Sequence, residues 1–347
     1  MGHALAAGTT ITGRPWIVIG TPGEAIGTLA KAGTAFYVYD NTSRTIHQDQ
    51  PIGVPGAAEA DDGFGTSVTG DAYRFAIGAP GEAIGTEADS GNVALFSHTL
   101  DADGFPTPIG GLDQNNDAVT GAAEAGDEFG ASLAMVSYRP SGSTTADTSI
   151  LAIGSPGETT AVDGVDKAEA GRAVLVRVNA DNTWGYLREL RQGTGDDTVS
   201  GTSETGDRMG ETLTAINTAP REVSSTDTLM VAVGTPGEAV GTAANSGAIH
   251  TFSLLGSAGD NDRWIEAGDG DGIPNAPGAD QKLGQSIHFT GTRLYAGMPY
   301  GPSTYGALYA LPLSNVTAGG TVAPVTTYQP GTGGLPAAGT DFGYAAR

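Results

Sequence analysis

The feature that most constrains the fold of this chain is a short phrase that occurs five times, in which an apolar run leads into Gly-x-Pro. Four copies continue to Pro-Gly-Glu and the fifth is weaker; they occupy residues 17–24, 75–82, 151–158, 231–238 and 294–299. The motif glycines are Gly20, Gly78, Gly154, Gly234 and Gly297, separated by 58, 76, 80 and 63 residues. A phrase repeated at this period indicates an architecture of similar units placed side by side.

Each unit carries a second mark upstream of that phrase, a large apolar residue followed by glycine. These pairs are Phe64-Gly65, Phe129-Gly130, Met209-Gly210, Leu283-Gly284 and Phe342-Gly343. A short run of small and apolar residues follows each pair, as expected for a strand near a crowded axis where only small side chains fit between large ones. We therefore predict that each pair opens the innermost strand of its unit.

The remaining strands of each unit follow the Gly-x-Pro phrase. A glycine precedes a β-rich run at residues 33–39, 91–96, 171–176, 247–252 and 306–310. Short segments such as 45–48 and 186–190 supply an outer strand, so each unit has four strands, the number in a propeller blade. A β-sandwich or a solenoid fits less well, because sandwich strands do not recur with a two-part signature and solenoid repeats are shorter.

This combination of marks resembles the FG-GAP repeat of integrin α-subunit propellers and of secreted bacterial integrin-like proteins. Phe64-Gly65 and Gly78-Ala79-Pro80 match both halves of that name, and the resemblance covers essentially the whole chain. It implies an all-β fold, a β-propeller-like array of five four-stranded blades plus the first strand of a sixth. Propellers of this family usually have seven blades, so truncation is the favoured interpretation, with an open arc or a small closed ring as alternatives.

We treat residues 1–347 as a single domain with repeats at about 1–56, 57–121, 122–201, 202–278 and 279–336 and a partial sixth at 337–347. Met1-Gly2 stands where Phe64-Gly65 stands in the next unit. The last strand, at Phe342-Gly343, has no later strand to complete its sheet. Because free sheet edges pair with other chains, we expect edge-strand association.

Composition excludes several classes of partner. Thirty-nine Asp and Glu against 16 Lys and Arg give a formal net charge of −23, which repels nucleic acid and anionic lipid. Membrane insertion is not expected, since no window approaches the roughly 18 apolar residues of a spanning helix. The absence of cysteine excludes disulfides and thiolate chemistry. The resemblance implies an extracellular protein, secreted or at the cell surface, whose signal peptide is not present in this chain.

The resemblance suggests calcium as a cofactor, because integrin-type propellers bind it through an Asp-x-Asp-x-Asp-Gly loop. The corresponding stretch at residues 69–74 offers one carboxylate, so calcium at that position is not expected. Two linkers contain weaker candidates, Asp101 with Asp103 and Asp269 with Asp271. Each pair supplies two oxygens where calcium needs six or more, so an Asp-rich turn is the alternative interpretation.

Four glutamates recur at one position of the repeat, directly after Gly-x-Pro-Gly. They are Glu24, Glu82, Glu158 and Glu238, and Tyr300 breaks the set in the fifth unit. Repeat symmetry would place them on equivalent loops, where they would form a ligand face for a cation or a basic partner. Alternatively, each glutamate serves its own loop, as repeated residues often do.

Catalysis has little support in this sequence. The five histidines occupy different repeat positions without metal-binding spacing, and no Gly-x-Ser-x-Gly elbow is present. Trp184 and Trp264 fall in linkers, where an exposed ring could stack on sugar or peptide or pack against a sheet edge. We therefore expect a non-catalytic binding or adhesion-type scaffold for a protein or carbohydrate ligand. The alternatives are a propeller-based hydrolase or lyase, and an architectural module of a larger secreted protein.

Overall fold

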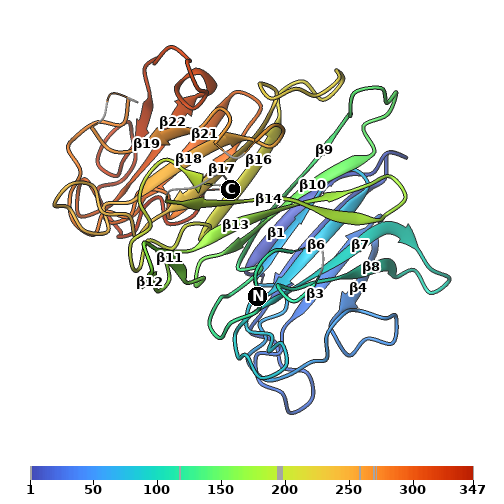
Figure 1. The fold of residues 1–347 in the computed structure, drawn as a ribbon. Helices are drawn as coiled ribbons and strands as arrows, with labels where there is room; N and C mark the ends of the chain where they lie inside the picture. The colour runs from blue at the N-terminus through green and yellow to red at the C-terminus, as the bar shows by residue number, and fades with distance from the viewer. Residues whose placement is uncertain are drawn as a thin grey trace. The chain divides into compact units, whose positions relative to one another are not determined.

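The protein is all-β in the computed structural model, which describes residues 2–116, 119–193, 198–257, 259–268, 270 and 272–346. Within these residues the only helical element is the single 3-10 turn η1 (Leu313–Asn315). The strands form a series of antiparallel sheets along the chain (Figure 1).

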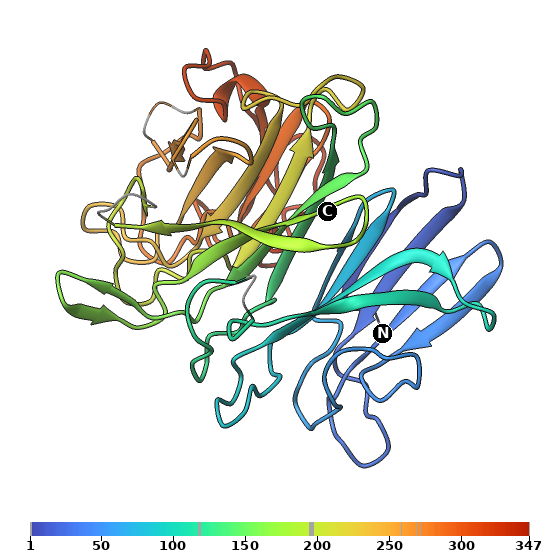
Figure 2. The ribbon, with the colours of Figure 1, turned by 45° about the vertical axis from the view of Figure 1, so that its right-hand side comes forward.

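The first two sheets have four strands each, paired in sequence order. The first contains β1 (Ala4–Thr9), β2 (Pro15–Thr21), β3 (Thr34–Tyr39) and β4 (Thr42–Ile46). The second contains β5 (Ser67–Gly70), β6 (Arg74–Ala79), β7 (Asn92–Leu100) and β8 (Pro106–Leu112). Strands β7 and β8 form a long, twisted hairpin (Figure 2).

The third sheet contains β9 (Ser132–Tyr138), β10 (Thr148–Ser155), β13 (Arg172–Val178) and β14 (Trp184–Gln192), and the short β15 (Thr198–Val199) pairs in parallel with β14. A separate hairpin, β11 (Thr160–Val162) and β12 (Val165–Lys167), lies in the loop between β10 and β13.

The fourth and fifth sheets repeat the four-stranded pattern. The fourth contains β16 (Thr212–Asn217), β17 (Leu229–Thr235), β18 (Ala248–Ser253) and β19 (Arg263–Ile265). The fifth contains β20 (Ser286–Phe289), β21 (Arg293–Met298), β22 (Ala307–Pro312) and β23 (Thr326–Tyr328). Each sheet therefore takes its strands from one of the repeats read in the sequence.

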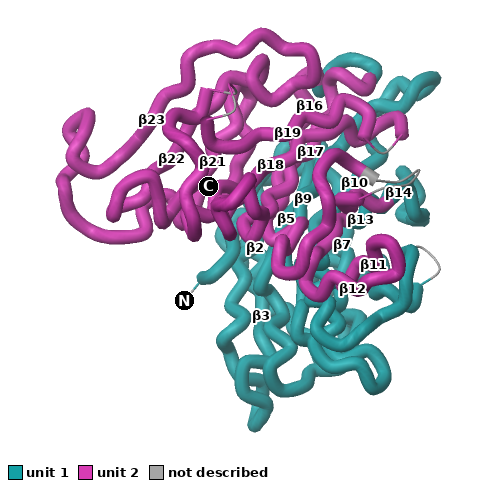
Figure 3. The backbone as a smooth tube through the Cα atoms, turned by 60° about the vertical axis from the view of Figure 1, so that its left-hand side comes forward, with its two compact units in different colours: residues 1–158, 174–188, 220–224 teal, residues 159–173, 189–219, 225–347 magenta. Residues whose placement is uncertain are grey.

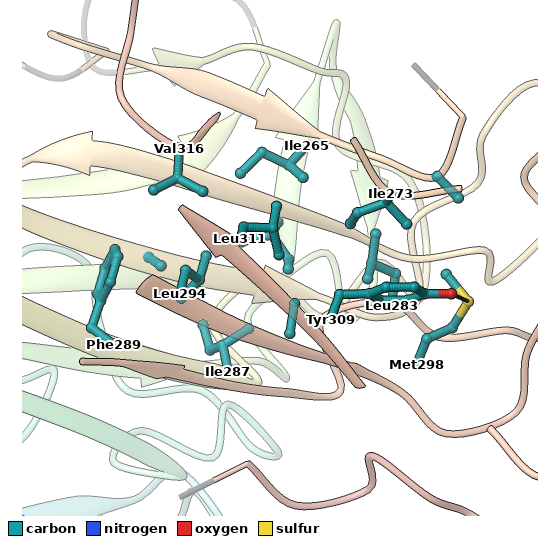
Figure 4. Packing of buried hydrophobic residues seen from close by; sticks show 14 of the residues in the cluster. Ile265, Ile273, Leu283, Ile287, Phe289, Leu294, Met298, Tyr309, Leu311 and Val316 are labelled. Atoms are coloured by element: carbon teal, nitrogen blue, oxygen red, sulfur yellow. Dashed lines mark hydrogen bonds between the residues drawn. The ribbon is translucent and has the colours of Figure 1, made fainter. Parts of the chain in front are cut away.

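Contacts divide the chain into two compact units (Figure 3). Unit 1 comprises residues 1–158, 174–188 and 220–224, and unit 2 comprises residues 159–173, 189–219 and 225–347. In unit 1 one apolar cluster lies between the first and second sheets and another between the second and third. In unit 2 a cluster that includes Leu294, Leu311 and Ile265 lies between the fourth and fifth sheets (Figure 4).

The repeated glycines lie where the backbone of one repeat closely approaches the backbone of the next. A Cβ on Gly78 would lie 2.1 Å from the carbonyl oxygen of Gly130, so no larger residue fits there. Ser67 Oγ donates to the same carbonyl at 2.6 Å. The Phe-Gly pair is thus a connector between repeats, and the inner strand begins two residues after it, at Ser67, rather than at the pair as we predicted.

The last Phe-Gly pair docks in the same way but forms no strand. Phe342 N–H donates to the Tyr305 carbonyl at 2.8 Å, and Ser286 Oγ donates to the Gly343 carbonyl at 2.7 Å. The described residues from 329 to 346 contain only the isolated bridge of Phe342. The inner strands of the second to fifth sheets begin two residues after their pairs, and only Ala345 and Ala346 are described from the corresponding point on, so the expected first strand of a sixth sheet is not formed among the described residues.

Candidate functional site

A surface groove in unit 1 has a volume of about 670 Å³. One wall is the β7–β8 hairpin and the other is the turn that leads into β14. Its lining combines an indole ring with hydroxyl, amide and carboxylate groups, from Ser97, Thr99, Thr107, Pro108, Ile109, Asp181, Asn182, Thr183 and Trp184.

Hydroxyl groups line the β7–β8 wall. The pairing of the two strands shifts register between Ser97 and Leu100, which marks a bulge; bulges re-aim side chains and recur next to binding sites. Ser97 Oγ donates to Thr99 Oγ1 at 3.0 Å, and Thr107 Oγ1 donates to the Thr99 carbonyl at 2.9 Å. These bonds fix three hydroxyls in a row while leaving lone pairs free to accept from a ligand.

The opposite wall is a tight turn closed by its own side chains. Asp181 Oδ1 accepts from Thr183 Oγ1 at 2.6 Å and from Thr183 N–H at 3.0 Å. These hydrogen bonds, the hydroxyl first, hold the pKa of Asp181 below its usual range. The turn therefore presents an ionised, fixed carboxylate to solvent at neutral pH.

A buried arginine ties this turn to the sheets beneath it. Arg74 is 2% exposed, and its guanidinium donates to the Asn179 carbonyl at 2.5 Å and to Asn182 Oδ1 at 2.8 Å. The same group donates to the Asp147 carbonyl and to Ser149 Oγ, at 3.0 and 3.1 Å. Because the planar fork fixes several acceptors at once, the wall of the groove is held in place before any ligand arrives.

Trp184 is the aromatic member of the groove and the first residue of β14, not a linker residue as the sequence suggested. Its ring packs over Gly110 so closely that a Cβ there would lie 2.2 Å from the indole. The side chain is half-buried and packs against the core cluster of the second and third sheets. Packing fixes the ring, and its remaining surface faces the groove.

The recurring glutamates lie elsewhere, at the junctions between consecutive repeats. Glu82 and Glu238 are 7% and 5% exposed, Glu158 is half-buried and Glu24 is exposed. A glutamine at the end of the outer strand of the preceding repeat, or two residues after it, donates its amide to Glu82, Glu158 and Glu238. The pairs are Gln48 with Glu82, Gln114 with Glu158 at 2.6 Å and Gln192 with Glu238 at 2.6 Å. The buried glutamates therefore do not present carboxylates to solvent, as a ligand face would require.

Sequence reasoning missed a second set of buried carboxylates at these junctions. Asp62, Asp127 and Asp207 are each 1% exposed. Each accepts the backbone N–H of a residue three positions earlier, Glu59, Glu124 or Glu204, at 2.5 to 2.7 Å. The signal was present as Glu-x-x-Asp before the Phe-Gly mark in three repeats.

Burial raises the pKa of four of the junction carboxyls. The pKa reaches about 7 for Glu82 and about 8 for Glu238. It reaches about 6 for Asp62 and about 7 for Asp207. Desolvation is the main cause in all four, and the neighbouring carboxylates add to it.

The acidic linkers do not form a metal site among the described residues. Asp101 Oδ1 accepts the N–H groups of Asp103 and Phe105, both at 2.9 Å, and so closes its own turn. Asp269 and Asp271 lie outside the described residues. In the part of the chain that the structure describes, no group of three or more His, Asp or Glu side chains could hold a metal ion.

The buried histidines serve packing. His98 lies between Tyr37 Oη and the Asp71 carbonyl, at 2.9 and 3.0 Å, and burial lowers its pKa to about 4. His250 is fully buried, with its Nδ1 atom 3.6 Å from Asp262. Trp264 packs edge-on against the His250 ring and donates to Glu266 at 2.7 Å, so this second candidate tryptophan braces its own sheet.

The fold and the groove together define an all-β repeat protein with a polar, aromatic-lined surface site. No family model matches the chain, and no curated protein matches it. The solved structures that are similar to this chain at low identity include the following two. One is a protein of unknown function from Dyadobacter fermentans, with 10% identity and a TM-score of 0.42 over 96% of this chain and 84% of that one. The other is a Hadza microbial sialidase, with 11% identity and a TM-score of 0.42 over 88% of this chain and 55% of that one.

No helix among the described residues is long and apolar enough to cross a membrane.

Proposed function

We propose that this chain is a non-catalytic, propeller-type binding scaffold that takes a neutral carbohydrate in the groove beside Trp184. The observation that carries the proposal is the lining itself, an indole ring facing a fixed row of hydroxyls and a fixed carboxylate. Sugars offer an apolar ring face and equatorial hydroxyls, which an aromatic ring and such polar groups complement.

Charge narrows the class of sugar. The chain carries a formal charge of −23, and Asp181 adds an ionised carboxylate to the groove. Anionic sugars would be repelled, whereas the hydroxyl groups of a neutral sugar can donate hydrogen bonds to Asp181 and to the threonine oxygens. The groove is open to solvent and of a size that suits a few sugar residues.

The propeller arrangement supports binding at such a place. Each described sheet takes its strands from one repeat, and consecutive sheets within a unit pack face to face. We propose that the five sheets are five blades of one such array, an integrin-α-like FG-GAP scaffold that acts outside the cell. The groove then lies between two neighbouring blades, bounded by the β7–β8 hairpin of one and the β13–β14 turn of the next.

A titration of neutral oligosaccharides by calorimetry tests the proposal. We expect wild type and the variant Tyr300→Ala to bind the same glycan, because Tyr300 is exposed but outside the groove. Trp184→Ala and the double variant Thr99→Val with Thr107→Val should lose at least about tenfold in affinity. Release of shortened products from the glycan by wild type would instead favour a hydrolase, and equal affinity in all variants would place binding elsewhere.

A further inference from the structure

Both faces of the second sheet are covered by apolar packing, one against the first sheet and the other against the third. For a given sheet, we call the face that packs on the preceding repeat the leading face and the opposite one the trailing face. On the second sheet the leading face includes Phe75, Ile77 and Phe96, all fully buried against the first sheet. On the fifth sheet it includes Leu294 and Ala296, fully buried against the fourth.

The first sheet has the same kind of apolar leading face, but the described residues on it are not buried. Strand register places Leu5 beside Ile19 and Phe36, and Ala7 beside Ile17 and Val38, on one face. Leu5 is 57% exposed and Ile17 is 37% exposed, and none of the six is buried. By register, Ile17 and Ile19 are the counterparts of the buried Phe75 and Ile77.

The trailing face of the fifth sheet is also incompletely covered. Register places Leu308 beside Tyr328, and Tyr295 beside His288 and Ala310, on this face. Tyr328 is 40% exposed, and His288, Tyr295 and Leu308 are half-buried. The counterparts of Leu308 and Tyr328 on the first sheet are Ala35 and Ile46, which are fully buried against the second sheet.

We propose that the leading face of the first sheet docks on the trailing face of the fifth sheet of a second copy of this chain. The contact would continue the repeat-to-repeat interface that already joins the sheets within each unit, with apolar residues opposite apolar and aromatic ones. Such an interface is head-to-tail, so it uses two different patches rather than one patch twice. This inference goes beyond the carbohydrate groove and does not depend on it.

Sedimentation equilibrium across a wide range of protein concentration tests the proposal. We expect the mass of wild type to rise with concentration, and to rise further with added salt, because each copy carries a charge of −23 and salt screens the repulsion. The control is Val165→Gln with Val223→Gln. Both valines are exposed but lie on neither face, so this variant should behave as wild type.

Two variants then decide the pairing. Leu5→Gln with Ile17→Gln removes the leading face, and Thr326→Gln with Tyr328→Gln removes the trailing face; all four positions are exposed, so folding should survive, as circular dichroism can verify. Each variant alone should lose the rise in mass, and an equimolar mixture should regain it but stop at a dimer. A wild type that stays monomeric at every concentration and salt, or a trailing-face variant that still dimerises by itself, would overturn the proposal.

Discussion

The side-chain amide of Gln48 donates to the buried carboxylate of Glu82, and so joins the end of one repeat to the motif loop of the next. The same pairing occurs at the next two junctions, through Gln114 and Gln192. At the fifth sheet both partners are gone, because Ala267 follows the outer strand and Gly301 takes the place of the glutamate. The pair thus belongs to the junction between repeats, not to a ligand site.

The raised pKa of the junction carboxyls predicts that the protein is most stable in mild acid. In the unfolded chain these groups titrate near pH 4, whereas Glu82 and Glu238 have pKa values of about 7 and 8 when folded. Between these limits the folded state holds more protons, so the free energy of unfolding falls as pH rises from about 4 to about 8. The Oε1 atoms of Gln48, Gln114 and Gln192 are buried without a partner, and rotation of the amide would let each accept from a protonated glutamate.

The variant Glu82→Gln tests this directly. It should stabilise the protein by roughly 1–3 kcal/mol at pH 8, where the buried carboxylate is charged, and by nothing at pH 4. Denaturant unfolding at the two pH values measures the difference. Glu24→Gln, at the exposed member of the set, should leave stability unchanged at both. A constant effect of Glu82→Gln across pH would contradict the titration.

Gly78→Ala should be one of the most damaging single substitutions in the chain. The added methyl would meet the backbone carbonyl of Gly130 at 2.1 Å, and the backbone there cannot move without displacing the next repeat. We expect a loss of about 3 kcal/mol or more, or failure to fold. Gly185→Ala, in β14, is the matched control because nothing lies within 4 Å of its Cβ. Equal midpoints in the thermal melts of the two variants would contradict the close backbone approach of Gly78 to Gly130.

Arg74→Lys should loosen the groove as well as the fold. Lysine keeps the charge but cannot reach Asn179, Asn182 and Asp147 with one planar fork. We expect a loss of about 2–4 kcal/mol in stability. Relative to wild type, amide hydrogen exchange should speed up more in the turn of residues 179–183 than in β2 and β3. An equal change in exchange in the turn and in the first sheet would show that Arg74 does not hold that wall of the groove.

Much of the fold could be predicted from the sequence because glycine and proline mark each repeat directly. The strand whose next-to-last residue is Gly20, Gly78, Gly154, Gly234 or Gly297 lies second in its sheet, as the pattern indicated. The role of the Phe-Gly pair could not be read in this way, since Gly65 and Gly130 act through contacts with the preceding repeat. The pattern also could not show which of the repeated side chains are buried. Repetition identified Glu82 and Glu238, but their burial and their bonds to a glutamine of the preceding repeat depend on contacts between residues far apart in the sequence.

The groove shows the same limit. Trp184 was noticed as an aromatic residue, yet its neighbours Thr99 and Thr107 come from the previous repeat, and Arg74 holds the turn from a distance of more than 100 positions along the chain. No local spacing connects these residues.

Fluorine NMR of protein labelled with fluorotryptophan tests the central claim most directly, because the chain has three tryptophans that occupy three different environments. Trp16 is buried between the first two sheets, Trp264 packs on His250, and Trp184 faces the groove. On addition of the neutral oligosaccharide that binds, we predict that only the resonance lost in Trp184→Phe changes position, with the sugar recovered intact. A shift confined to Trp16 or Trp264, or three unchanged resonances with every neutral sugar, would contradict the claim that this groove is the binding site.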